Sequence, residues 1–294
     1  MNNLSLAGLL HIFGWIGDNH KIKLEDGLSI EYSPSGDIIA FYNKLCSENY
    51  IDDGEPFTYQ VYILSEKEFG EWDLALGTPF STIDFVANII AINISQPIGM
   101  CRVIASNDNF RTHQFTTDIF QYGIQSDALA LYNHKITDEI KNNIAGSYKN
   151  LKEIENKNGY LKRVRNALVY FYYAWRSPFL EQTNINLAIS LESLFSPSSN
   201  NELSHQIAFN IAKFLAKTPE SQTKYYEQIK KFYSIRSKIV HGSVPGDAII
   251  WDSTIESFHL TAVILRKILL DKNLIEIFND NKKRIDYLRE NMFL

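Results

Sequence analysis

The chain has 294 residues, of which 45% are hydrophobic and 13% are aromatic, and its formal net charge is −5. This composition can bury a sizeable core, which excludes a disordered chain, and the acidic total argues against a protein that coats nucleic acid with its whole surface. The length exceeds that of one average domain, so we expect two domains.

Cysteine usage and the N-terminal stretch indicate the compartment. Cys46 and Cys101 are the only cysteines and form no CxxC pair, so we expect two buried thiols with no disulfide framework or structural zinc site. Residues 1–20 are mildly apolar, but they show no basic leader and no small-residue cleavage site, and the longest apolar run is shorter than a bilayer span. We therefore expect a cytoplasmic protein with no membrane segment, cofactor or metal.

The charge is unevenly distributed. Residues 1–159 hold 11 Lys and Arg against 21 Asp and Glu, a net charge of −10. Residues 160–294 hold 18 against 13, a net charge of +5. This division suits a module that handles nucleic acid, attached to an acidic partner domain.

The first half mixes strand and helix patterns. In chain order we expect a hairpin over His20–Tyr32 turning at Glu25-Asp26-Gly27, a helix over Asp37–Leu45, a strand over Phe57–Leu64, a helix carrying Ile83, Val86, Ala87 and Ile90, and a strand over Pro97–Ala105. No catalytic constellation or Gly-rich phosphate motif is present in this half. Its four histidines stand apart and are expected to be surface or packing residues: His11, His20, His113 and His134.

From about Thr137 onward the pattern is helical almost throughout, with breaks at proline and serine clusters. The expected helices are Thr137–Ile154 (polar and exposed), Tyr160–Arg176, Asn184–Phe195, Glu202–Lys217, Lys224–His241, Ser253–Asp271 and a short tail helix near Asn281–Asn291. On Lys224–His241 we expect one shared face of Ile229, Phe232, Tyr233, Arg236, Ile239 and Val240. The predicted fold class is therefore α+β: a mixed α/β domain over residues 1–150, followed by an all-α helical bundle over residues 155–294.

Glu192 stands at an unusual place on its helix. It neighbours Ala188 and Ile189 on one side and Phe195 on the other, which places a carboxylate on or beside the apolar face. A buried carboxylate needs a cation or hydrogen-bond donors, and Arg236 occupies the equivalent position on a later helix. We expect the two to face one another across the bundle; the alternative is that Glu192 lies at the edge of the stripe and is solvated.

The segment YSIRSKIVHG, residues 233–242, places Arg236 and His241 on one helix with four residues between them. An arginine and a histidine can bind a phosphate and transfer protons, which are the requirements for cleaving RNA without a metal. The alternative is a helix C-cap, in which Gly242 is the C′ residue and the nearby cations offset the helix dipole. Ser237, Lys238 and Lys231 are candidate substrate-binding residues, although solvated helix ends use the same residue types.

The order of three segments, LAISLESLF, ELSHQIAFNIAKFLA and FYSIRSKIVHG, resembles the HEPN domains of the ApeA-like type over about residues 160–275. The N-terminal half is also similar in layout to the mixed domain upstream in such proteins, where it has a sensing or regulatory role. The resemblance implies a usually dimeric helical domain and, in many members, a metal-independent endoribonuclease of toxin or anti-phage systems. Arg236 and His241 match the family's Arg-x4-6-His pair and Glu192 an acidic position, whereas Ser243 stands where a toxin subgroup has tyrosine.

The chemistry of these residues requires a second copy of the chain. The 2′-hydroxyl of RNA needs a base, the leaving 5′-oxygen needs an acid, and one chain offers one such histidine. We therefore expect a homodimer whose two copies of Arg236, His241 and Glu192 complete one site for RNA, with a phage-derived trigger or an antitoxin as a further candidate partner. Two alternatives remain: a non-catalytic HEPN module that dimerises or binds a nucleotide or partner protein, and an unrelated helical protein whose motif is a helix cap.

Overall fold

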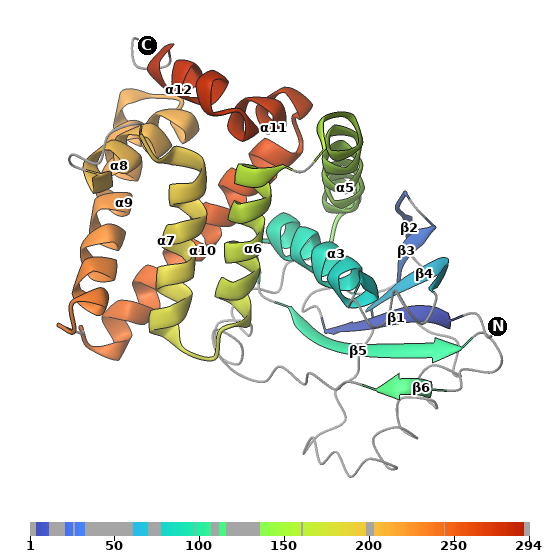
Figure 1. The fold of residues 1–294 in the computed structure, drawn as a ribbon. Helices are drawn as coiled ribbons and strands as arrows, with labels where there is room; N and C mark the ends of the chain where they lie inside the picture. The colour runs from blue at the N-terminus through green and yellow to red at the C-terminus, as the bar shows by residue number, and fades with distance from the viewer. Residues whose placement is uncertain are drawn as a thin grey trace. The chain divides into compact units, whose positions relative to one another are not determined.

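The computed structural model describes the chain in eleven stretches: residues 4–11, 21–25, 27–32, 61–69, 78–96, 98–106, 112–115, 136–159, 161–197, 203–243 and 245–290. The chain divides into two compact units, one of residues 1–94, 98–121 and 129–149, and one of residues 95–97, 122–128 and 150–294. The described part is mostly helical: the first unit contains a sheet, and the second is a bundle of helices (Figure 1).

The first unit contains a six-stranded sheet in the order β2-β3-β4-β1-β5-β6, in which every neighbouring pair is antiparallel. The strands are β1 Leu4–His11, β2 Lys21–Lys23, β3 Leu28–Tyr32, β4 Val61–Phe69, β5 Gly99–Ser106 and β6 Thr112–Phe115. β2 and β3 pair as the predicted hairpin, and Gly27 before β3 adopts φ +71°, which glycine tolerates better than other residues. β5 confirms the predicted strand over Pro97–Ala105 within two residues.

Some of the predictions for this unit need correction. β4 extends five residues beyond the predicted end at Leu64, and β1, which no sequence pattern indicated, pairs with both β4 and β5. The predicted helix over Asp37–Leu45 and the residue Cys46 lie outside the described residues.

Helix α3, Thr78–Ile94, confirms the helix expected around Ile83–Ile90 and packs on β1, β4 and β5. Helix α5, Asp138–Asn158, was predicted to be polar and exposed, and this prediction is wrong for one face. Ile144, Tyr148 and Leu151 are buried there, and Asn93 of α3 donates a 3.3 Å hydrogen bond to Ser147. These residues recur every three or four positions, so even a helix rich in charge buries one narrow stripe.

The second unit comprises the end of α5 and seven further helices among the described residues. These are α6 Lys162–Arg176, α7 Leu180–Phe195, α8 Leu203–Leu215, α9 Pro219–Val240, α10 Asp247–Leu269, α11 Lys272–Asn279 and α12 Asn281–Glu290. α7, α9 and α10 begin four to six residues before their predicted starts, and α11 was not predicted. α10 is the one described helix long and apolar enough to cross a bilayer by length and composition, and twelve of its residues are buried in the bundle.

Aromatic packing forms much of the bundle core. Phe171 of α6 stacks on Phe258 of α10 with ring centroids 4.9 Å apart. Phe195, Phe214 and Phe278 form a triangle of edge-to-face contacts that joins α7, α8 and α11, with centroids 5.3–5.5 Å apart. Phe195 therefore fastens the C-terminal end of α7 to α8 and α11.

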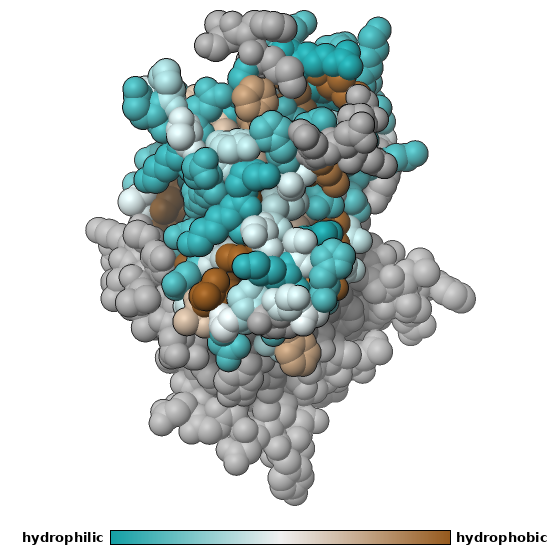
Figure 2. Space-filling view, turned by 90° about the vertical axis from the view of Figure 1, so that its left-hand side faces the viewer, coloured by the Kyte–Doolittle hydropathy of each residue, from teal (hydrophilic) through white to brown (hydrophobic). Residues whose placement is uncertain are grey.

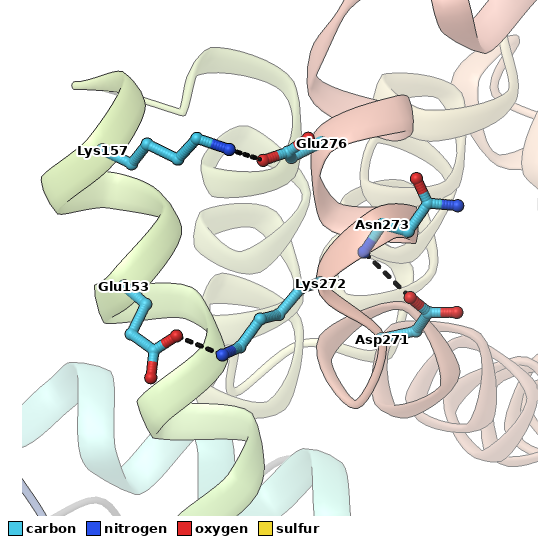
Figure 3. Close-up of polar contacts among 6 residues, drawn as sticks. All are labelled: Glu153, Lys157, Asp271, Lys272, Asn273 and Glu276. Atoms are coloured by element: carbon cyan, nitrogen blue, oxygen red, sulfur yellow. Dashed lines mark hydrogen bonds and ion pairs between the residues drawn. The ribbon is translucent and has the colours of Figure 1, made fainter.

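Ion pairs tie α5 to the α11 segment within the second unit (Figure 3). Lys157 pairs with Glu276 at 2.8 Å, and Glu153 pairs with Lys272 at the start of α11. Asp271 caps the same helix by accepting hydrogen bonds from the backbone of Asn273 and Leu274. These contacts are largely exposed, so they orient the two helices more than they stabilise the fold.

Candidate active site on helices α7 and α9

Local signals fix the positions of α7 and α9. α7 follows Pro178, whose missing N–H ends α6, and three of its buried polar side chains hydrogen-bond neighbouring helices. α9 begins with a capping box between Thr218 and Ser221 and has Pro219 in its first turn. The Thr218–Pro219 start is readable from sequence, yet the predicted helix began only at Lys224.

Two arginines hold the C-terminal end of α7. Arg284 of α12 is 1% exposed and donates through Nη1 to the carbonyl oxygens of Leu194 (3.1 Å) and Ser196 (2.5 Å). Arg163 of α6 donates to the Ser193 carbonyl at 3.2 Å. Burial and then the nearby charge of Arg163 lower the pKa of Arg284 to about 10. These contacts anchor the helix turn that carries Glu192.

Glu192 and Arg236 face one another across the bundle, as predicted. The Glu192 Oε1 and Arg236 Nη2 atoms are 3.9 Å apart, and the side chains are 22% and 32% exposed. This distance allows an ion pair but exceeds that of a hydrogen bond. Burial raises the pKa of the Glu192 carboxyl, and the charge of Arg236 offsets part of that rise.

Arg236 keeps unused donor capacity. Its Nε atom is buried and has no hydrogen-bond partner among the described residues, and no described group lies within hydrogen-bond distance of its Nη atoms. A guanidinium has five N–H donors in a planar fork that fits phosphate oxygens. The arginine is thus held by one loose ion pair, with donors left for a ligand.

Tyr233 belongs to the same group of residues, although sequence reasoning treated it only as part of an apolar face. It is 6% exposed, and its hydroxyl donates a long 3.5 Å hydrogen bond to the carbonyl of Ala188, one turn before Glu192. Burial raises the pKa of Tyr233 well above its ordinary value; the charge of Glu192 adds to the rise and that of Arg236 opposes it. The hydroxyl therefore stays neutral beside the ion pair.

His241 lies at the end of α9, where Gly242 and Ser243 form the cap that the alternative interpretation predicted. Gly242 has φ +76°, and its N–H donates to Ile239 at 3.2 Å while the N–H of Ser243 donates to Lys238 at 2.9 Å. This is a Schellman motif, in which His241 is the C-cap residue. The cap is formed by backbone hydrogen bonds and leaves the imidazole of His241 exposed, so it does not conflict with a chemical role for that side chain.

Within one chain the structure does not bring His241 to Arg236. Five residues on a helix advance by about 7.5 Å and rotate by about 140°, so the two side chains leave α9 in different directions. Arg236 faces α7, whereas His241 is exposed, as are the predicted substrate-binding residues Ser237, Lys238 and Lys231. One chain therefore presents an arginine-carboxylate pair and a separate imidazole.

Exposed apolar side chains surround this end of the bundle. Ile235, Ile239 and Ile250 form a small core here, against which Leu180 and Ile185 of α7 pack. Three apolar residues that adjoin this core in sequence are exposed to solvent. Phe179, before Leu180, is 68% exposed; Val240, after Ile239, is 49% exposed; and Ile249, before Ile250, is 52% exposed. The prediction that Val240 shares the buried face is therefore wrong, because the bundle ends before its last turn. Figure 2 shows the α9 side of the molecule, where apolar residues are interspersed among polar ones, with a small apolar group near the lower edge of the coloured part.

Two arginines near the start of α6 form contacts within the fold. Arg163 caps α7, and Arg165 forms an ion pair with Glu155 at 2.6 Å. Both arginines therefore have a structural role.

Searches against protein-family models, curated proteins and solved structures found no match to this chain.

Proposed function

We propose that this chain is a metal-independent endoribonuclease of the HEPN type, acting in a toxin or anti-phage abortive-infection system through a composite site at a homodimer interface. The observation that carries the proposal is the separation of Arg236, loosely paired with Glu192, from the exposed imidazole of His241 on the same helix. Two chains related by a twofold axis can place both copies of Arg236 and both copies of His241 around one phosphate.

The proposed reaction needs only the substrate and these side chains. Neutral His241 accepts the proton of the 2′-hydroxyl, and O2′ attacks the adjacent phosphorus. A P–O2′ bond forms, the P–O5′ bond breaks, and protonated His241 of the partner subunit gives its proton to the leaving O5′. The products are a 2′,3′-cyclic phosphate and a 5′-hydroxyl.

Arg236 stabilises the negative charge that develops on the phosphorane oxygens, and Glu192 orients Arg236. A half-buried carboxylate 3.9 Å away holds the guanidinium without using all its donors. The exposed apolar group of Phe179, Val240 and Ile249 lies on the elements that meet at the end of α9, and a second copy would cover it. The first unit would then sense a trigger or restrain the nuclease.

The experiment is cleavage of single-stranded RNA by the full chain, with and without EDTA. We expect 2′,3′-cyclic phosphate ends, no cleavage of DNA, and losses of about 10²- to 10⁴-fold for both His241→Ala and Arg236→Ala. Ser243→Ala, beside the histidine, and Arg289→Ala, an exposed arginine of α12, are the matched controls and should retain activity. Intact RNA after incubation with the wild-type chain would favour the non-catalytic binding module instead.

A further inference from the structure

His205 of α8 and Tyr226 of α9 form a pair of aromatic side chains on the surface, away from the site described above. His205 Nδ1 and the hydroxyl of Tyr226 are 2.7 Å apart. Their rings meet edge to face, with centroids 5.5 Å apart and planes at 82°. His205 is exposed and Tyr226 is half-buried, so two oriented rings border solvent.

One face of α9 connects this pair to His241. Tyr226, Lys230, Ser234, Ser237 and His241 follow one another at i, i+4, i+8, i+11 and i+15, which places them along one side of the helix. Ser234, Ser237 and His241 are exposed, and Lys230 is half-buried. The fifteen residues from Tyr226 to His241 span about 22 Å of helix axis.

The same helix pair carries an excess of positive charge. Residues 203–243 contain seven Lys and Arg against two Asp and Glu, a net charge of +5, which equals the net charge of residues 160–294. Besides Arg236, four of these cations lie on α9: Lys224, Lys230, Lys231 and Lys238. Within the part of the chain that the structure describes, none of the four forms an ion pair.

Unpaired cations beside aromatic rings that border solvent are the features with which proteins bind single-stranded nucleic acid: the charges follow the backbone and the bases stack on the rings. We infer that Tyr226, held by His205, forms a base-stacking subsite for a single RNA strand that runs along α9 toward His241. At the stacked spacing of about 3.4 Å per nucleotide, the strand would cover about six nucleotides between the two ends. This inference rests on the proposed nuclease function and specifies how its substrate is held.

A purely structural role for the pair makes a different prediction. If the hydrogen bond only fastens α8 to α9, Tyr226→Phe and Tyr226→Ala would both lower the melting temperature, and neither would change RNA affinity in the folded protein. If the ring stacks a base, Tyr226→Phe keeps the ring and preserves binding, whereas Tyr226→Ala loses it.

The test is fluorescence anisotropy of the full chain with a 2′-O-methyl RNA 12-mer, which cannot be cleaved. We expect Tyr226→Ala to raise the Kd about tenfold, and Tyr226→Phe and the control Tyr173→Ala, an exposed tyrosine of α6, to change it less than about twofold. Cleavage of a dinucleotide, too short to reach Tyr226, should be unchanged in Tyr226→Ala. Should that variant fail to fold, Tyr226→Leu, which keeps an apolar side chain but no aromatic ring, replaces it.

Equal affinity of wild type and Tyr226→Ala for the 12-mer would overturn the subsite, and so would equal losses in Tyr226→Ala and Tyr226→Phe. Either result leaves the nuclease intact if the wild type still cleaves RNA. A wild type that binds the 12-mer through Tyr226 but cuts no RNA would instead overturn the proposed function and retain the subsite.

Discussion

Glu192 is the residue whose environment most directly links the fold to the proposed chemistry. Its carboxyl is half-buried and its cationic partner is 3.9 Å away, so desolvation outweighs the attraction of Arg236 and raises the pKa. An ordinary surface ion pair would have lowered that pKa. Burial of the ionised Glu192 carboxylate therefore costs the fold some stability at neutral pH, which is the pattern expected where a charge is kept for function.

This balance predicts how stability depends on pH. Because the pKa of Glu192 is higher in the folded than in the unfolded chain, the folded state binds more protons just above the ordinary value of 4.5. The contribution of Glu192 to the free energy of unfolding is therefore greatest at low pH and falls as the pH rises through the folded pKa.

Thermal unfolding of wild type and Glu192→Gln across pH 4–7 measures this effect. The melting temperature of Glu192→Gln relative to wild type should rise with pH, because glutamine carries no charge to bury. Glu290→Gln, at an exposed site on α12, serves as the control with no such trend. A difference that stays constant or falls as the pH rises would show that the pairing with Arg236 outweighs burial.

Replacing Arg236 by lysine separates the effect of its positive charge from that of its planar guanidinium. Arg236→Lys keeps the positive charge but loses the planar fork, so it should remain folded and recover only a small part of the RNA cleavage lost in Arg236→Ala. Full activity of the lysine variant, measured with the same RNA, would mean that charge alone suffices.

At the scale of elements, α7 is the helix on which the site depends. It joins an aromatic cluster through Phe195, its buried polar side chains hydrogen-bond neighbouring helices, and Arg163 and Arg284 cap its C-terminal end. The carbonyls of a helix C-terminus carry partial negative charge, so they suit the two guanidinium groups. α12 thereby fixes a helix turn that is distant in sequence.

Removing the buried cap should destabilise the bundle. Arg284→Met fills a similar volume but leaves the carbonyls of Leu194 and Ser196 without donors, at a cost of about 2 kcal/mol. Urea unfolding measures the change, with Arg289→Met on the exposed side of the same helix as the control. If the two variants unfold at the same urea concentration, the cap contributes nothing.

Several elements could be predicted from the sequence because their signals are local. Apolar spacing and a following proline located α6, and alternation around a glycine turn located the β2–β3 hairpin. The pairing of Glu192 with Arg236 followed from finding each on an apolar stripe. β1 was missed because LSLAGLLH does not alternate, and α11 because an eight-residue helix between two others lacks a pattern of its own.

Other features depend on where helices end in space, which periodicity does not encode. Val240 continues the apolar stripe of α9 in sequence, but its side chain is exposed at the end of the bundle. Helix α5 is rich in charged residues, yet it buries a narrow stripe of apolar side chains. Tyr233 and Arg284 take their importance from partners 45 and about 90 residues away. Such contacts arise only once the bundle is assembled.

At the scale of the whole molecule, the proposed mechanism requires a second copy of the chain. One chain has a single His241 at the end of α9, beside exposed apolar side chains on three elements. We expect Val240→Asp combined with Ile249→Asp to shift the protein from dimer to monomer in sedimentation velocity and to abolish cleavage, because charges would be buried in the interface. Val169→Asp, at an exposed apolar site on α6, should leave the dimer intact. An unchanged dimer in the double variant would place the interface elsewhere.

The most direct test of a shared site is a heterodimer of one wild-type and one His241→Ala subunit, purified through two different tags. If one histidine acts as base and the other as acid, the heterodimer should lose about 10²- to 10⁴-fold in RNA cleavage, close to the loss in the doubly substituted dimer. Half of the wild-type activity would instead show that each chain carries a complete site, and would contradict the composite mechanism.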